Sequence, residues 1–201
     1  MSAPISLSDL AWSTPDGRTL FSHLDLTFDT ARTGLVGRNG VGKSTLLGLI
    51  SGALTPHAGR VHFDGTLGVL RQTVQIDEDE TIPDLLGVTE ALSLLRRAEN
   101  GEANADELSD ADWTMETRIA SAFNRVGLSA RPETPLVALS GGQRTRAALA
   151  ALILSEPDFI LLDEPTNNLD RDGRAAVIDL LADWRTGAII VSHDRELLDT
   201  V

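Results

Sequence analysis

Residues 37–45, GRNGVGKST, have the residue types and spacing of a loop that binds phosphate. Their glycines allow consecutive backbone N–H groups to converge on phosphate oxygens without a Cβ in the way. Lys43 adds a compact positive charge where the wide planar fork of arginine would not fit, and it is the only lysine in the chain. We therefore predict a nucleoside triphosphate bound by Gly37, Arg38, Asn39, Gly40, Val41, Gly42, Lys43, Ser44 and Thr45.

Acidic and polar residues follow three apolar segments. FILLDE ends in Asp163 and Glu164, AIIVS is followed by His193, and LGVLRQ ends in Gln72. An aspartate at the carboxyl end of a strand beside a phosphate loop can hold Mg²⁺ together with the hydroxyl of Ser44. Glu164 could polarise an attacking water as a general base, and His193 could contact the γ-phosphate. Gln72 could coordinate Mg²⁺ or the attacking water, although taken alone it reads as a surface residue.

A second glycine pair, Gly141-Gly142 in LSGGQ, stands at the opening of a predicted helix. Glycines there cost backbone entropy unless the backbone must approach something closely. A helix N-terminus also presents unpaired N–H groups to an anion. The chain thus carries two candidate anion sites about a hundred residues apart, and the first segment alone does not explain the second.

The elements needed to position these residues can be read from the hydrophobic pattern. Alternation around the turn Pro15-Asp16-Gly17 predicts two antiparallel strands within the first 28 residues. A short strand at 33–37 precedes the phosphate loop, a helix from Lys43 stops at Gly52, and the segments RVHF and LGVLRQ read as strands. After residue 139 we expect a helix (140–155), a strand (159–163), a helix (171–184) and a strand (188–192). The last two strands are almost wholly apolar, as in a parallel sheet buried on both faces.

Residues 73–139 differ in character and predict a helical insert. The cluster at 77–80 reads as a solvated acidic loop, and Thr81 with Pro83 resembles a helix start. Met115, Ile119, Phe123 and Val126 form one helical face that ends near Gly127. The fold class is α/β. We expect one domain over residues 1–201, with an ATPase core at 1–72 and 140–201 and a helical subdomain at 73–139.

Composition excludes several function classes. The net charge of −13 argues against direct nucleic-acid binding by this stretch of chain. No run of 18 apolar residues and no signal peptide are visible, so we expect a cytoplasmic protein without a membrane span. The absence of cysteine excludes disulfides and thiolate metal sites.

In this order, the motifs resemble the nucleotide-binding domain of the ATP-binding cassette (ABC) superfamily, a P-loop NTPase with a RecA-like parallel core and an N-terminal antiparallel β subdomain. Gly37–Thr45 match the Walker A loop, Gln72 the Q-loop, Asp163-Glu164 the Walker B end and His193 the switch histidine. Leu139 to Gln143 match the signature motif, with Ser140, Gly141, Gly142 and Gln143 in its trans site, and Asp170 matches the D-loop aspartate. The resemblance implies ATP and Mg²⁺ as cofactors. It also implies head-to-tail pairing with a second ABC domain, from the same full-length chain or a homodimer, which would explain two half-sites in one cassette.

LDEPTNNLD and SHDRELLD resemble the ABC-F class, most closely the first cassette of such a protein. This resemblance implies a soluble ATPase acting on the ribosome, in translation or antibiotic resistance, through regions absent here, and it implies that the chain is a fragment of a two-cassette protein. The alternative is the ATPase subunit of a membrane transporter. One departure concerns adenine, which the family often stacks on an aromatic residue. Thr14 stands there, and we favour core packing over a platform role for nearby Trp12.

Overall fold

A computed structural model describes residues 3–70 and 79–201, and its elements fall into two compact units. Unit 1 takes the described residues of 1–72, 156–167 and 181–201. Unit 2 takes those of 73–155 and 168–180. Within the described ranges, no helix is both long and apolar enough to cross a bilayer.

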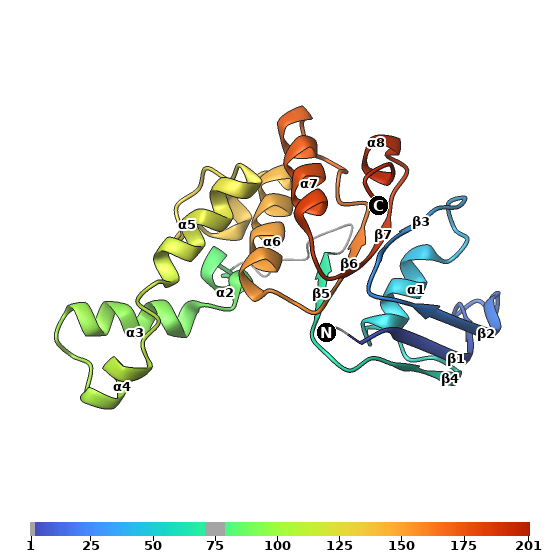
Figure 1. Cartoon of the computed structure of the whole chain (residues 1–201), viewed down its shortest axis with the longest axis horizontal. Coiled ribbons are helices and arrows are strands. Elements are labelled where there is room, and N and C mark those ends of the chain that lie inside the picture. The colour runs from blue at the N-terminus through green and yellow to red at the C-terminus, as the bar shows by residue number, and fades with distance from the viewer. Residues whose placement is uncertain (1–2, 71–78) are drawn as a thin grey trace. The chain divides into compact units, whose positions relative to one another are not determined.

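Unit 1 begins with an antiparallel sheet. Strand β1 (Ile5–Ser13) pairs with β2 (Thr19–Phe28) on one side and with β4 (Ala58–His62) on the other, which gives the order β2-β1-β4 (Figure 1). The turn between β1 and β2 contains Pro15-Asp16-Gly17, and Gly17 there has φ +88°. The alternating pattern of the first 28 residues therefore predicted both the strands and their pairing correctly.

The second sheet of unit 1 is parallel and positions the polar residues. Its order is β3 (Arg32–Leu35), β7 (Gly187–Val191), β6 (Phe159–Asp163), β5 (Leu67–Leu70). Every residue of β6 and β7 is buried, in agreement with their apolar sequences. Because all neighbouring strands run parallel, the segments after β3, β6 and β7 leave the same edge of the sheet.

Helix α1 (Lys43–Ile50) packs against both sheets of unit 1. Leu46, Leu47, Leu49 and Ile50 join one buried cluster with Ile5 and Leu10 of β1 and Phe159 and Leu161 of β6. Burial of each such side chain stabilises the fold by roughly 1.5–3 kcal/mol. The cluster holds the start of α1, and with it the phosphate loop, beside the ends of β6 and β7. The short helix α8 (Arg195–Leu198) follows β7.

Unit 2 is helical. It contains α2 (Ile82–Leu86), α3 (Thr89–Glu99), α4 (Ala105–Asp110), α5 (Met115–Val126), a 3₁₀ turn (Leu136–Ala138), α6 (Gly141–Ser155) and most of α7 (Arg171–Asp183). Thr81 and Asp84 form a capping box at the start of α2, which is the helix start that Thr81 and Pro83 predicted. Ile119, Phe123 and Val126 are buried on the predicted face of α5, which ends at Gly127 in the left-handed region.

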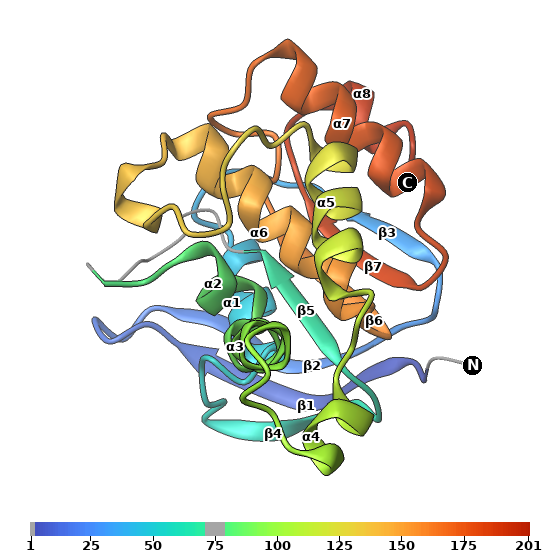
Figure 2. The same ribbon diagram turned by 90° about the vertical axis from the view of Figure 1, so that its left-hand side faces the viewer.

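Helices α5 and α6 lie side by side in unit 2, and α2 also contacts α6 (Figure 2). The sequence grouped residues 140–155 with the ATPase core, whereas the contacts of α6 with α2 and α5 group it with the helices of unit 2. The helices α3, α4 and α8 and the 3₁₀ turn were not predicted. The acidic residues 77 and 78 lie outside the described residues, as does Gln72.

Candidate functional site

A cavity of about 640 Å³ lies in unit 1 at the edge of the parallel sheet. This volume falls in the range of cavities that bind small molecules. The predicted residues that line it are Asn39, Gly40, Gly42, Lys43, Ser44, Thr45, Asp163, Glu164 and His193. Leu20, Asn167, Val191, Thr14 and Arg18 complete its walls. Residues more than 150 positions apart in the sequence therefore face one space.

The phosphate loop closes on its own lysine. The Lys43 ammonium donates to the carbonyl oxygens of Gly37, at 2.7 Å, and Arg38, at 3.2 Å. Gly37 and Arg38 thus contribute through their carbonyls and do not line the cavity, and Val41 of the predicted set is 51% exposed. The ammonium stands at the start of α1, where unpaired N–H groups also favour an anion.

Gly42 precedes α1 and is the glycine on which the loop most depends. Its φ of +108° lies in the region that disfavours any side chain. A Cβ there would approach the ring of Phe21 to 3.0 Å. A side chain at this position would therefore both strain the backbone and displace the strand residue that packs against the loop.

Asp163 ends β6 with its carboxylate almost completely buried. The residue is 8% exposed, and its Oδ1 has no hydrogen-bond partner among the described residues. A buried carboxylate oxygen without a partner is costly unless something else satisfies it. Ser44, whose side chain carries a hydroxyl oxygen, lines the same cavity. These oxygens are ligands that Mg²⁺ prefers, so the residues present fit that ion.

In the described part of the chain, no group of three acidic, histidine or cysteine side chains could hold a metal by itself.

Glu164 occupies a strained position at the turn after β6. Its φ is +51°, unusual for a residue with a side chain, and its N–H donates to the carbonyl of Val191 at 2.8 Å. The side chain is 12% exposed. Such strain persists only where the surroundings hold the residue, and it is frequent in active sites.

His193 connects the loop to Glu164. Its Nε2 lies 3.0 Å from Oδ1 of Asn39 and 3.5 Å from Oε1 of Glu164, and its backbone N–H donates to Oε2 of Glu164 at 3.3 Å. The structure thus brings together the histidine, the glutamate and the phosphate loop that the sequence predicted as parts of one site.

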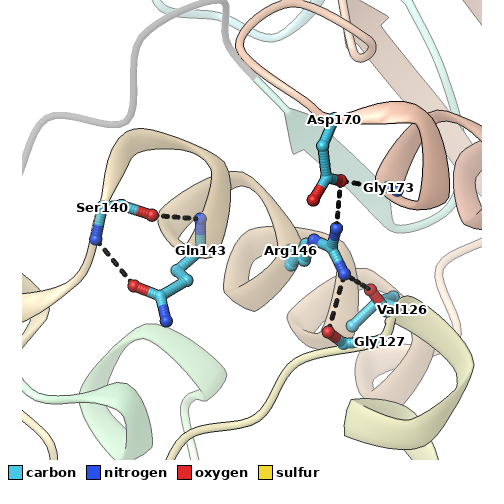
Figure 3. Close-up of polar contacts among 7 residues, drawn as sticks. All are labelled: Val126, Gly127, Ser140, Gln143, Arg146, Asp170 and Gly173. Atoms are coloured by element: carbon cyan, nitrogen blue, oxygen red, sulfur yellow. Dashed lines mark hydrogen bonds and ion pairs between the residues drawn. The ribbon is translucent and has the colours of Figure 1, made fainter.

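The predicted signature residues line a separate cavity of about 750 Å³ in unit 2. The N–H of Ser140 donates to Oε1 of Gln143 at 2.9 Å, and the N–H of Gln143 donates to Oγ of Ser140 at 3.3 Å, which caps α6 reciprocally (Figure 3). A Cβ on Gly142 would approach the carbonyl oxygen of Asn168 to 2.9 Å, whereas one on Gly141 would meet open space. The second glycine is therefore needed for packing and the first keeps the backbone accessible.

Arg146 fixes the predicted D-loop aspartate to the helices and was missed by sequence reasoning. Its guanidinium donates to the carbonyl of Gly127 at 2.7 Å and pairs with Asp170, as Figure 3 shows. Asp170 also accepts from the N–H of Gly173 at 2.8 Å. That hydrogen bond, with the charge of Arg146, holds the pKa of the Asp170 carboxyl below its usual value. An arginine inside the apolar stretch AALAALIL would have indicated a buried charge with a specific partner. Arg146 instead precedes that stretch directly, so its position gave no such indication.

Replacement of Arg146 by alanine is expected to lower the free energy of unfolding by about 2–3 kcal/mol, because the arginine side chain is only 15% exposed and its acceptors would be left unpaired. Urea denaturation measures this loss. The exposed Arg174 of α7 provides the matched control, and Arg174→Ala should change stability by less than about 0.5 kcal/mol. Equal stability of the two variants would contradict the prediction.

The Asp170 carboxylate makes this stability depend on pH. Because the pKa of Asp170 is lowered in the folded state, its contribution to stability is present above the unfolded pKa and is lost as the pH falls through the folded pKa.

Residues 22–167 match the family model described as "ABC transporter". The chain belongs to the ATP-binding cassette family. The fold is accordingly the P-loop NTPase fold, with an antiparallel sheet, a parallel core sheet and helices.

Among curated relatives, this cassette is 36% identical over 211 residues to the tylosin resistance ATP-binding protein TlrC of Streptomyces fradiae, covering 92% of this chain and 38% of the relative. It is 34% identical over 194 residues to the energy-dependent translational throttle protein EttA of Mycobacterium tuberculosis, and the match covers 85% of this chain and 34% of that relative. It is 33% identical over 196 residues to ABC transporter F family member 3 of Arabidopsis thaliana, covering 96% and 25%. The resemblance to ABC-F proteins is thus confirmed, and the chain spans between a quarter and two fifths of these relatives.

Among solved structures, the fold matches a dimeric post-hydrolysis state of the ATP-binding cassette MJ0796 bound to ADP and Pi. The TM-score is 0.74, the identity 21%, and the match covers 98% of this chain and 90% of that one. At this identity the match shows the fold alone.

Proposed function

We propose that this cassette binds and hydrolyses ATP in an ABC-F class protein and that each catalytic site is completed by a second cassette. One observation carries the proposal. Among the described residues, the cavity of the phosphate loop is lined only from unit 1, and the cavity of the signature motif only from unit 2. A head-to-tail pair would bring the signature residues of one cassette to the triphosphate of the other, and a two-fold axis makes that contact reciprocal.

The residues have distinct roles in this proposal. Lys43 and the N–H groups at the start of α1 bind the β- and γ-phosphates. Ser44 and Asp163 hold Mg²⁺, which neutralises charge on the phosphates when it is bound, and Gln72 would join them. Glu164 accepts a proton from the attacking water, and His193 contacts the γ-phosphate from the position that Asn39 and Glu164 give it.

In the second cassette, Ser140, Gly141, Gly142 and Gln143 would recognise the γ-phosphate, and Asp170 would transmit the closed state across the interface. The exposed space at Gly141 supports a close backbone approach by a ligand. Hydrolysis removes the γ-phosphate and so weakens the contact between the two cassettes, which allows them to separate.

The client proposed is the ribosome, in translation or antibiotic resistance, and the protein would act in the cytoplasm. Support comes from two relatives, one named for tylosin resistance and one for translational throttling. The alternative, the ATPase subunit of a membrane transporter, is favoured by the description of the matching family model. The codons after Val201 and the neighbouring genes separate the two functions. A basic linker followed by a second cassette supports the ribosomal client, and neighbouring permease genes support transport.

Steady-state ATPase activity of the full chain, measured against its concentration, tests the requirement for pairing. We expect the rate per chain to rise with concentration, because each site lacks a signature segment until two copies meet. Sedimentation in parallel reports the fraction of pairs. A high rate per chain that stays constant where the chain is shown to be monomeric would contradict the proposal.

A further inference from the structure

One wall of the unit 1 cavity is formed by residues that have no role in the proposed chemistry. The phosphate loop, Asp163, Glu164 and His193 account for the triphosphate and the attacking water. Thr14, Arg18 and Leu20 line the same cavity from the β1–β2 turn and the start of β2. A nucleotide also has a base, and among the described lining residues the only ring is that of His193, which contacts Asn39 and Glu164.

Trp12, the nearest aromatic residue of β1, faces elsewhere. Its ring is stacked on His57 with ring centroids 6.2 Å apart and an interplanar angle of 12°. It also packs against the buried cluster of unit 1 and does not line the cavity. The core position that the sequence favoured for Trp12 agrees with these contacts, so the base requires another partner.

Thr14 is used to build the turn. Its hydroxyl donates to the carbonyl of Arg18 at 3.1 Å and accepts from the N–H of Arg18 at 3.1 Å, and its own N–H donates to the same carbonyl at 2.9 Å. These bonds close the loop over Pro15, Asp16 and Gly17. They also fix the backbone of Arg18, so the direction in which its side chain leaves the turn is set by Thr14.

The Arg18 side chain reaches back to the phosphate loop. Its Nη2 donates to the carbonyl of Gly40 at 3.3 Å, while His193 contacts the neighbouring Asn39. The loop is therefore contacted by Arg18 from the antiparallel sheet and by His193 from the end of the parallel sheet. Since Lys43 and the helix N-terminus already serve the phosphates, Arg18 is a second cation on the cavity wall that phosphate binding does not require.

We propose that the planar guanidinium of Arg18, with Leu20 beside it, is the platform on which the base of the bound nucleotide stacks. This inference rests on the proposed ATP binding. A guanidinium is flat, weakly hydrated and stacks on aromatic faces, whereas an ammonium cannot. The contact gives general affinity for the base, because every base has a π-face.

Calorimetric titration of the full chain with Mg·ATP and with Mg·tripolyphosphate tests the platform, since the second ligand has no base. Arg18→Ala is expected to weaken ATP binding by about 3- to 30-fold and to leave tripolyphosphate binding within about twofold. Arg18→Lys should lose as much ATP affinity as Arg18→Ala, and Arg18→Tyr should keep it. The exposed Arg60 of β4 lies outside the cavity, and Arg60→Ala is the control.

The outcomes separate this inference from the proposed function. If Arg18→Ala binds ATP like the parent, or loses affinity equally for both ligands, the arginine is not a base platform although the cassette still binds ATP. Full affinity in Arg18→Lys would show that charge matters and planarity does not, and this also overturns the inference. If the parent binds no ATP, the proposed function itself fails.

Discussion

Replacement of Glu164 by glutamine is expected to slow ATP hydrolysis by roughly 10²- to 10⁴-fold while ATP binding is kept. The amide has the shape of the carboxylate but cannot accept the proton of the attacking water. The backbone of Glu164 is held by its hydrogen bond to Val191, so the exchange should not move the residue. Phosphate release in a single turnover and calorimetric ATP affinity, measured on the same preparation, separate the two effects.

A second expected result is the accumulation of pairs. With hydrolysis blocked, the γ-phosphate remains, and ATP should shift Glu164→Gln toward a dimer in sedimentation velocity experiments more than it shifts the parent. Glu196→Gln on the exposed face of α8 is the control, because it makes the same chemical change outside the cavity. Hydrolysis at the parental rate by Glu164→Gln would show that another group is the base.

Much of this site could be predicted because its positions follow from local pattern. The apolar runs of β6 and β7 indicate strands buried on both faces, and parallel strands end at one edge of a sheet. The polar residues that follow them, Glu164 and His193, therefore had to meet near the phosphate loop. In the structure, Nε2 of His193 lies 3.5 Å from Oε1 of Glu164.

The contacts that were missed depend on packing between distant segments. Arg146 pairs with Asp170 and donates to the carbonyl of Gly127 at the end of α5, and Arg18 donates to the phosphate loop. Such contacts produce no local periodicity in the sequence. Helix α3 was missed although its sequence, TEALSLLRRAE, contains three leucines, of which Leu92 and Leu95 are buried.

Lys43→Ala is expected to weaken ATP binding by at least about 10²-fold, because each hydrogen bond to a charged partner contributes about 1.5–3 kcal/mol and the ammonium can donate three. Calorimetry measures the loss. Lys43→Arg is the informative companion, since it keeps the charge but replaces a compact donor with a wide fork. We expect Lys43→Arg to bind weakly as well, and unchanged affinity in Lys43→Ala would remove Lys43 from the binding site.

The composition offers a direct measurement of the same contact. Lys43 is the only lysine, so expression with ¹³C,¹⁵N-labelled lysine labels one residue without changing its side chain. In the structure the ammonium donates to the carbonyls of Gly37 and Arg38. Those carbonyls carry partial charge and a triphosphate carries full charge, so ATP should draw the ammonium away and shift the ¹³Cε resonance of Lys43. Magnesium tripolyphosphate should produce the same shift, because the lysine binds the phosphates and not the base.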